Sequence, residues 1–421
     1  MTESLLVVLY GETVGTLERL SRHSEPTFSY DETYLSTGST PLSVRLPLSA
    51  QTYGRQAIVP FIEGLLPENP DTRARWASRL GTDQEDTFTL LSVMGWDCPG
   101  AVQFSVPDEL PEMVARSSET VPVSELDIGE RLRGLREDSA SWSLPEEHWS
   151  LPGQQDKFAL VRADSGWHAA HGSAATTHIF KPGIGRLHHH ALVEHATMRA
   201  ADRVGVDVAH TSYQDFDDEP AIVVERFDRI VLPDGQVLRL HQEDFCQASG
   251  RLPARKYEED QGPRAADMVR IIGANSRDRD EDSRALADFL IINYVAGAPD
   301  GHSKNISLTL RPDGIFMAPL YDLASAFPYG AANPAFRRVA LSIGGRRDLG
   351  QVMAKNWDKA AEILKLPAEW MRTRARHVAE AFPDAFSESL GDIGTPQAAD
   401  IRARSMDLMA AHCADLVRGL G

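Results

Sequence analysis

The chain has 421 residues, of which 42% are hydrophobic and 25% are charged, and its formal net charge is −18. These values are typical of a soluble globular protein with enough chain for two or three domains. The acidic balance argues against a broad nucleic-acid-binding surface, because neutralising phosphates needs Lys and Arg. The three scattered cysteines argue against a disulfide framework and a Cys-x-x-Cys metal site. We find no signal peptide and no apolar run of the ~18 residues that a membrane span needs, so we expect a cytoplasmic protein with no membrane partner.

Residues 1–108 predict a small mixed module. The apolar run from Leu5 to Tyr10 ends at Gly11, which indicates a strand, a tight turn and a second strand. Downstream patterns favour strands at 28–30 and 42–46, and helices that begin at 61 and cover 73–80 and 86–94.

Residues 109–148 are rich in Pro, Ser, Glu and Asp and read as a connector with one short helix near 123–135. Residues 149–235 are rich in strand signals, and residues 236–421 are mostly helical. This order matches the two lobes of a protein kinase. The expected elements are strands at 158–162, 167–169, 177–181 and 221–227, helices at 187–204 and 285–296, a hairpin over 306–317, and about three helices over 351–416.

Three oxygen-bearing side chains have the spacing of a kinase catalytic centre. Asp300 precedes Asn305 by five positions, and Asp322 follows past the expected hairpin. In protein kinases an Asp in the first position orients the attacking hydroxyl, while the Asn and the second Asp hold Mg²⁺ on the ATP phosphates. Each residue alone also fits a surface turn or a helix cap, and only the combined spacing favours the site. His302, between the two, could contact a phosphate or hold the loop.

The strand-rich region offers parts of a nucleotide site. Lys181 ends a strand, as the phosphate-binding Lys of kinases does, although edge-strand lysines are common. Glu194, one helix later, could pair with Lys181 or lie on a solvated helix face. The segment 149–157 contains Gly153 and could cover phosphates with backbone N–H groups. The segment around Glu225 and Phe227 lies where the hinge between lobes is expected, and its backbone could bind adenine.

The run His188-His189-His190 invites a metal interpretation. Contiguous side chains point in different directions, and no carboxylate or Cys lies at ligand spacing. The pattern therefore favours a solvated loop before a helix.

Several ordered motifs are similar to those of the HipA family, the kinase toxins of bacterial toxin–antitoxin systems. The resemblance covers essentially the full length. The motifs are Val14–Leu17, Leu65–Asn69, Gly95–Ala101, Ser150–Lys157, His178–Pro182, Glu225–Arg229, Glu243–Gln247, Asp300–Asn305 and Pro319–Asp322.

The resemblance implies an α+β, two-lobed protein-kinase-like fold related to lipid kinases, with a small mixed N-terminal module and an all-helical C-terminal lobe. It implies ATP and Mg²⁺ as cofactors, Asp300 as the catalytic residue, and Asn305 and Asp322 as metal ligands. It places Ser150 at the autophosphorylated serine, whose phosphate would eject its loop and inactivate the enzyme. The ATP-binding residues that we expect are Gly153, Gln154, Lys157, Lys181, Glu225, Phe227, His302 and Lys304.

The resemblance also implies partners. Family members phosphorylate an aminoacyl-tRNA synthetase, such as glutamyl-tRNA synthetase, and are restrained by HipB, a helix-turn-helix antitoxin that contacts operator DNA. We therefore expect DNA contact only through the antitoxin complex. Two alternatives stay open: a catalytically silent nucleotide-binding scaffold in an antitoxin–DNA repressor complex, and a kinase of small molecules or lipids.

Overall fold

The structure, a computed structural model, describes residues 2–137, 146–330 and 334–421. The chain divides into two compact units, and helices and sheets occur in both, as the α+β prediction requires. Unit 1 comprises residues 1–182, 214–254 and 308–315, and unit 2 comprises 183–213, 255–307 and 316–421.

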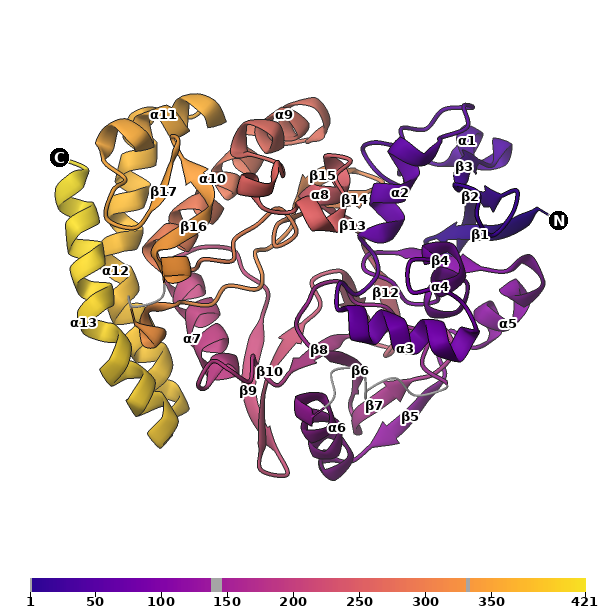
Figure 1. Cartoon of the computed structure of the whole chain (residues 1–421), viewed down its shortest axis with the longest axis horizontal. Coiled ribbons are helices and arrows are strands. Elements are labelled where there is room, and N and C mark those ends of the chain that lie inside the picture. The colour runs from indigo at the N-terminus through magenta and orange to yellow at the C-terminus, as the bar shows by residue number, and fades with distance from the viewer. Residues whose placement is uncertain (1, 138–145, 331–333) are drawn as a thin grey trace. The chain divides into compact units, whose positions relative to one another are not determined.

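A four-stranded antiparallel sheet begins unit 1, in the order β3-β2-β1-β4 (Figure 1). Tyr10 and Gly11 join β1 to β2 with φ of 55° and 82°, the left-handed conformation that a two-residue hairpin turn needs. Leu5 of β1 lies opposite Leu17 of β2, and both side chains are buried, so the alternating pattern in the sequence produces the core face. The strands are β1 (Glu3–Leu9), β2 (Glu12–Arg19), β3 (Thr27–Tyr30) and β4 (Val102–Ser105), with helices α1 (Glu32–Thr37), α2 (Arg55–Glu63), α3 (Pro70–Leu80) and α4 (Thr87–Met94).

A six-stranded sheet in the order β5-β7-β6-β8-β10-β9 follows. The expected connector holds the predicted helix, but it also supplies β5, which pairs with β7 and extends this sheet. The strands are β5 (Thr120–Val123), β6 (Phe158–Ala163), β7 (Gly166–Ala170), β8 (His178–Lys181), β9 (Thr211–Phe216) and β10 (Glu219–Glu225), and the connector helices are η1 (Pro107–Glu109), α5 (Leu110–Ala115) and α6 (Glu125–Glu137).

Two sequence predictions in unit 1 are wrong. Residues 42–46 form no strand, because their backbone groups bond to side chains instead of a neighbouring strand. The Leu42 N–H donates to the hydroxyl of Tyr30, and the Val44 N–H donates to the carboxylate of Glu243. The helix expected to begin at residue 61 is α2, which begins at Arg55 and ends at Glu63.

Unit 2 is mainly helical. Helix α10 begins with charged residues, but from Ala285 onward it is mostly buried, as the apolar sequence of 285–296 predicts, and the expected trio of helices closes the chain (Figure 1). Its helices are α7 (His190–Arg203), η3 (Glu258–Asp260), α9 (Ala265–Asn275), α10 (Arg279–Val295), η4 (Phe327–Tyr329), η5 (Pro334–Arg337), α11 (Ala354–Leu364), α12 (Ala368–Ile393) and α13 (Pro396–Gly419).

Short strands also occur after residue 228, before the helical end of the chain. The predicted hairpin is present as β14 and β15, and β13 completes a three-stranded sheet. The remaining elements are β11 (Arg229–Val231), β12 (Val237–Arg239), β13 (His241–Asp244), α8 (Phe245–Ala248), η2 (Pro253–Arg255), β14 (Ser307–Arg311), β15 (Gly314–Met317), β16 (Arg338–Ile343) and β17 (Arg346–Asp348).

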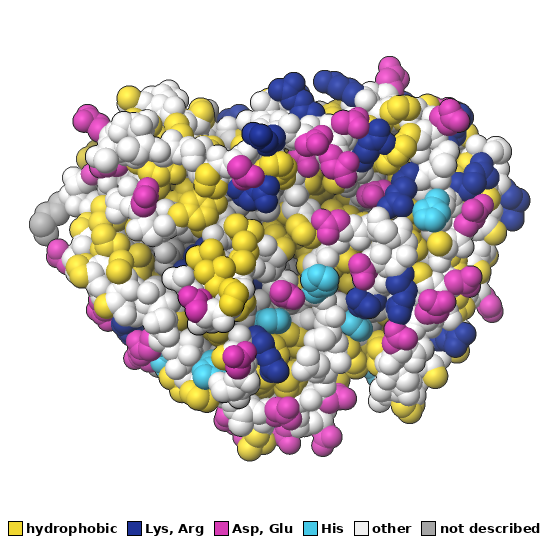
Figure 2. All heavy atoms as spheres, turned by 180° about the vertical axis from the view of Figure 1, so that it is seen from behind, with side chains coloured by type: hydrophobic (Ala, Val, Ile, Leu, Met, Phe, Trp, Pro, Cys, Tyr) yellow, Lys and Arg dark blue, Asp and Glu magenta, His cyan; other side chains and the backbone are white. Residues whose placement is uncertain are grey.

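Charged side chains of both signs share one face of the molecule. Figure 2 shows Asp and Glu side chains interspersed with Lys and Arg over the face that it displays. Among the residues that the structure describes, no helix combines the length and the apolar character that crossing a membrane requires.

Candidate active site

The loop after α10 fixes its own shape through hydrogen bonds. The Asn305 side chain donates from Nδ2 to the backbone carbonyl of Asp300 at 2.9 Å, and the Asn305 N–H donates to the carbonyl of His302 at 2.9 Å. Because the amide nitrogen of Asn305 is bound in this way, the oxygen Oδ1 is the atom that suits a cation.

Asp300 carries an exposed carboxylate, which is what a residue that must meet a substrate needs. The hydroxyl of Tyr257 donates a hydrogen bond to Oδ1 of Asp300. The ring of Tyr257 packs edge-on against His302, with centroids 4.9 Å apart. Tyr257 was missed by sequence reasoning, because it lies outside every motif, and only the fold brings it to the loop.

His302 is buried, with 4% of its surface exposed. The pKa of His302 is lowered to about 3, chiefly by burial and also by the charges of Lys256 and Lys304, while the charge of Asp322 acts to raise it. The imidazole is therefore neutral near pH 7. Its Nδ1 accepts from the Lys304 N–H at 3.3 Å, so the ring holds the loop between Asp300 and Asn305.

Gly301 allows the loop to pack closely on α10. A Cβ atom at residue 301 would come within 3.0 Å of the side-chain amide of Asn293, which is buried on α10. A glycine is thus required at position 301 by the close contact with Asn293 and not by a positive φ.

The segment after β15 returns to the same loop. The hydroxyl of Tyr321 donates to the carbonyl of Lys304 at 2.7 Å and lies 2.6 Å from Oγ of Ser307. This bond anchors the neighbour of Asp322. Asp322 itself has φ of 62°, a conformation that is uncommon outside Gly, Asn and Asp and that often marks functional positions.

Unit 2 therefore contains five of the predicted site residues, on the anchored loop and on the segment that follows β15. They are Asp300, His302, Lys304, Asn305 and Asp322. Lys304 and Asn305 are each 6% exposed, and Asp322 is half-buried. Amide and carboxylate oxygens form a hard donor set that fits Mg²⁺.

The other predicted residues belong to unit 1. Lys181 is the last residue of β8, lies opposite Ile222 of β10 and is 6% exposed. Burial of a Lys to this degree argues against an ordinary edge-strand lysine. Glu225 ends β10 with an exposed side chain, and Phe227 is half-buried two residues later.

The segment that contains Ser150 lies against the N-terminal module. Ser150 is fully buried; its N–H donates to the carbonyl of Asp97 at 2.9 Å, and its hydroxyl donates to the carbonyl of Leu65 at 2.6 Å. Further along, the Glu68 N–H donates to the carbonyl of Gly153 at 3.0 Å. The loop is thus hydrogen-bonded to residues 65, 68 and 97 of the N-terminal module.

The same loop turns at Gly153, whose φ is 103°, a value that L side chains rarely adopt. Lys157 donates from Nζ to the carbonyl of Pro152 at 2.7 Å and closes the turn, while Gln154 is exposed at its tip.

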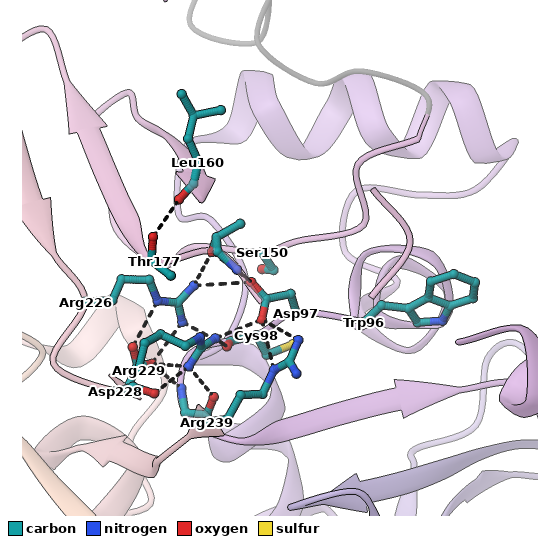
Figure 3. Close-up of polar contacts among 12 residues, drawn as sticks. Trp96, Asp97, Cys98, Ser150, Leu160, Thr177, Arg226, Asp228, Arg229 and Arg239 are labelled. Atoms are coloured by element: carbon teal, nitrogen blue, oxygen red, sulfur yellow. Dashed lines mark hydrogen bonds and ion pairs between the residues drawn. The ribbon is translucent and has the colours of Figure 1, made fainter. Parts of the chain in front are cut away.

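Asp97 lies at the centre of a buried ion cluster, which Figure 3 shows surrounded by guanidinium groups. Asp97 forms ion pairs with Arg229 at 2.8 Å and with Arg239 at 3.0 Å. Beside them, Arg226 forms an ion pair with Asp228 at 2.9 Å. Burial acts to raise the pKa of Asp97, but the three arginines outweigh it, so the pKa lies below its usual value.

This ion cluster gives the expected hinge motif a structural role that sequence reasoning missed. Arg226 and Arg229 point into the cluster, whereas Glu225 is exposed. The signal was present, since Asp97 in the segment 95–101 and the charged motif 225–229 both lie next to apolar segments. Buried charges are retained when they are paired, and these two motifs pair with each other.

Glu194 lies on α7 in unit 2 and is 1% exposed, which excludes the solvated helix face. Its pairing with Lys181 of unit 1 stays a prediction.

Comparison with known proteins identifies the family. The family described as HipA N-terminal domain matches residues 5–105, and the family described as HipA-like C-terminal domain matches residues 149–386. The chain belongs to the HipA family. Two relatives are similar to this chain over most of their length. Y4mE of Sinorhizobium fredii, a proposed kinase, is 34% identical over 93% of this chain and 93% of its own. The serine/threonine-protein kinase toxin HipA of Shewanella oneidensis is 30% identical over 83% of this chain and 80% of its own.

A solved structure of the Shewanella oneidensis MR-1 HipA system with HipB and its operator DNA has the same fold. Its TM-score is 0.83 at 27% sequence identity, and the match covers 98% of this chain and 99% of that one. The expected kinase-like architecture of the HipA family is therefore confirmed for this chain.

Proposed function

We propose that this chain is a HipA-type serine/threonine protein kinase and the toxin of a toxin–antitoxin pair. The observation that supports the proposal is the anchored loop of unit 2, where Asn305 bonds to the carbonyl of the exposed Asp300 and Tyr321, the neighbour of Asp322, bonds to the carbonyl of Lys304. We retain the predicted division into 1–108, 109–148, 149–235 and 236–421 as part of this proposal.

Asp300 would orient the substrate hydroxyl and take up its proton, with Tyr257 holding the carboxylate through a hydrogen bond to Oδ1. Asn305 and Asp322 would hold Mg²⁺, which neutralises charge on the ATP phosphates. Gly153, Gln154, Lys157, Lys181, His302 and Lys304 would contact phosphates, and the backbone at Glu225 and Phe227 would receive adenine.

The kinase test uses the purified chain with Mg-ATP and follows γ-phosphate transfer to Ser150 and to aminoacyl-tRNA synthetases. Asp300→Asn should lower the transfer rate by roughly 10²–10⁴-fold, the usual contribution of a positioned base. Asp313→Asn is the matched control, because Asp313 lies exposed in the turn of the β14–β15 hairpin, after the loop that contains Asp300. No phosphoserine and no ATP turnover in the wild type, with ATP still bound, would favour the silent scaffold. Turnover on metabolites or lipids alone would favour the alternative of a small-molecule or lipid kinase.

Ser150 would be the self-inactivating site. Its hydroxyl is buried against Leu65, so a phosphate carrying roughly −1.5 to −2 charge does not fit there without release of the loop. The test compares limited proteolysis at 149–157 before and after phosphorylation, with Ser150→Ala as control. Unchanged cleavage in the phosphorylated chain would contradict this role.

The proposed partners are a HipB-like helix-turn-helix antitoxin and, through it, operator DNA. The support is the full-length similarity to the HipA chain solved with HipB and operator DNA. The substrate proposal, an aminoacyl-tRNA synthetase such as glutamyl-tRNA synthetase, rests on the family resemblance. Phosphoproteomics of cells that express wild type or Asp300→Asn tests it directly.

A further inference from the structure

Two of the three consecutive histidines meet a carboxylate that is remote in sequence. Potential ligand atoms of His188, His189 and Asp400 all lie within 4.8 Å of one another. Among the described residues, these three have potential ligand atoms close enough together to hold one metal ion. The carboxylate that the sequence pattern lacked is supplied by α13, more than two hundred positions later.

The backbone explains how adjacent histidines come to face the same side. His189 precedes α7 with φ of 54° and ψ of 37°, the left-handed conformation. This turn brings the rings of His188 and His189 to a centroid distance of 3.8 Å, with 45° between their planes. In an extended chain the two rings would diverge.

We propose that His188, His189 and Asp400 form a site for a transition-metal ion such as Zn²⁺. Two imidazole nitrogens and one carboxylate oxygen match three protein ligands of a tetrahedral zinc ion, whose fourth position water can fill. Bonds of about 2.0–2.1 Å at tetrahedral angles place ligand atoms about 3.4 Å apart. The three side chains are exposed or half-buried, so modest rotations close the remaining gap.

One neighbour opposes the ion. Arg404 donates from Nε to Oδ2 of Asp400 at 2.7 Å, one helical turn along α13. Its guanidinium would compete with the metal for the carboxylate and repel it. Removing this charge should therefore tighten binding of an ion that uses the Asp400 carboxylate.

The site would join the start of α7 to α13 within unit 2. Helix α7 carries the buried Glu194 in its second turn. The bound ion would restrain the end of this helix, and this consequence is independent of the proposed kinase activity.

The test titrates Co²⁺ and then Zn²⁺ into the full chain, without a histidine tag and after removal of trace metal. We expect one Co²⁺ per chain with visible absorption of a low-coordinate site, displaced by Zn²⁺. His188→Ala, His189→Ala and Asp400→Asn should each weaken binding at least tenfold, and Arg404→Gln should tighten it severalfold. His377→Ala, an exposed histidine on α12, is the control and should change nothing.

Amide hydrogen exchange gives a second readout, because metal should slow exchange in the first turn of α7 in the wild type and not in Asp400→Asn. Equal Co²⁺ affinity of the wild type and the His188→Ala/His189→Ala double variant would overturn the proposal. So would an unchanged affinity of Asp400→Asn.

Discussion

The hydroxyl of Tyr257 donates a hydrogen bond to Oδ1 of Asp300, the carboxylate proposed to receive the substrate proton. A bond to one oxygen helps to fix the plane of the carboxylate in which the substrate hydroxyl must be met. We predict that Tyr257→Phe lowers kcat roughly 10- to 150-fold, since a hydrogen bond to a charged group contributes about 1.5–3 kcal/mol, while KM for ATP stays near its wild-type value.

The Phe variant keeps the ring packed on His302, so the comparison isolates the hydroxyl. Steady-state kinetics at saturating Mg-ATP provide the measurement. A kcat above wild type would instead mean that Tyr257 competes with the substrate for Asp300.

Close packing at Gly301 predicts a steric defect with a specific rescue. In Gly301→Ala the new Cβ meets the Asn293 amide, which should destabilise the chain by about 1–3 kcal/mol and impair transfer. Asn293→Ala/Gly301→Ala should recover part of the lost activity because the obstructing amide is gone. Urea denaturation and transfer rates check both statements, and a double variant no better than Gly301→Ala would refute the steric explanation.

The buried cluster around Asp97 predicts a large stability effect. Asp97→Ala leaves Arg229 and Arg239 without this carboxylate, which should lower the free energy of unfolding by about 3–5 kcal/mol. Asp108→Asn, at an exposed position in the same module, should change it by less than about 0.5 kcal/mol. Urea midpoints with unchanged m-values are the measurement, and equal midpoints for the two variants would contradict the cluster's role.

Glu243 predicts a pH dependence of stability. It is fully buried and accepts from Ser43 at 2.6 Å and from the Val44 N–H at 2.8 Å. Burial raises the pKa of Glu243 from 4.5 to about 7, so the folded chain binds a proton that the unfolded chain has already released between these values. The stability contribution is therefore complete below about pH 4.5 and lost as pH rises to about 7.

The wild type should lose up to ~3 kcal/mol across this window relative to Glu243→Gln, whose neutral amide does not titrate. The measurement is the free energy of unfolding at several pH values. Glu12→Gln, at an exposed position, should follow the wild type. Parallel curves for wild type and Glu243→Gln would show that the carboxyl is charged throughout.

Local patterns carried most of the fold prediction. The period-2 runs of β1 and β2, the apolar helix α10 and the Pro-Asp-Gly hairpin turn before β15 depend on neighbours in sequence, and all are present. Residues 42–46 failed because their apolar alternation is satisfied by a loop whose backbone bonds to Tyr30 and Glu243. A single sequence does not reveal such distant partners.

The candidate site likewise combines residues that local patterns predict with residues that only distant contacts reveal. Asp300, Asn305 and Asp322 were predicted from their spacing, and the structure adds that Tyr321 and His302 bond to the Lys304 backbone beside them. Tyr257 carried no pattern, and the histidine pair lacked a carboxylate until α13 supplied Asp400. Contacts between elements far apart in the chain decide these cases.

The cluster of Asp97 with its arginines sets a limit on how the protein can be divided. The two family matches, 5–105 and 149–386, suggest pieces that evolution or an experimenter might separate. Yet a fragment that begins at residue 149 would keep Arg226, Arg229 and Arg239 with only Asp228 as their acidic partner in the cluster. It would also lose Asp97 and Leu65, which bind Ser150. Asp97 of the N-terminal module thus neutralises arginines that lie beyond residue 149, and gene truncations at this boundary should yield unstable chains instead of an independently folded C-terminal fragment.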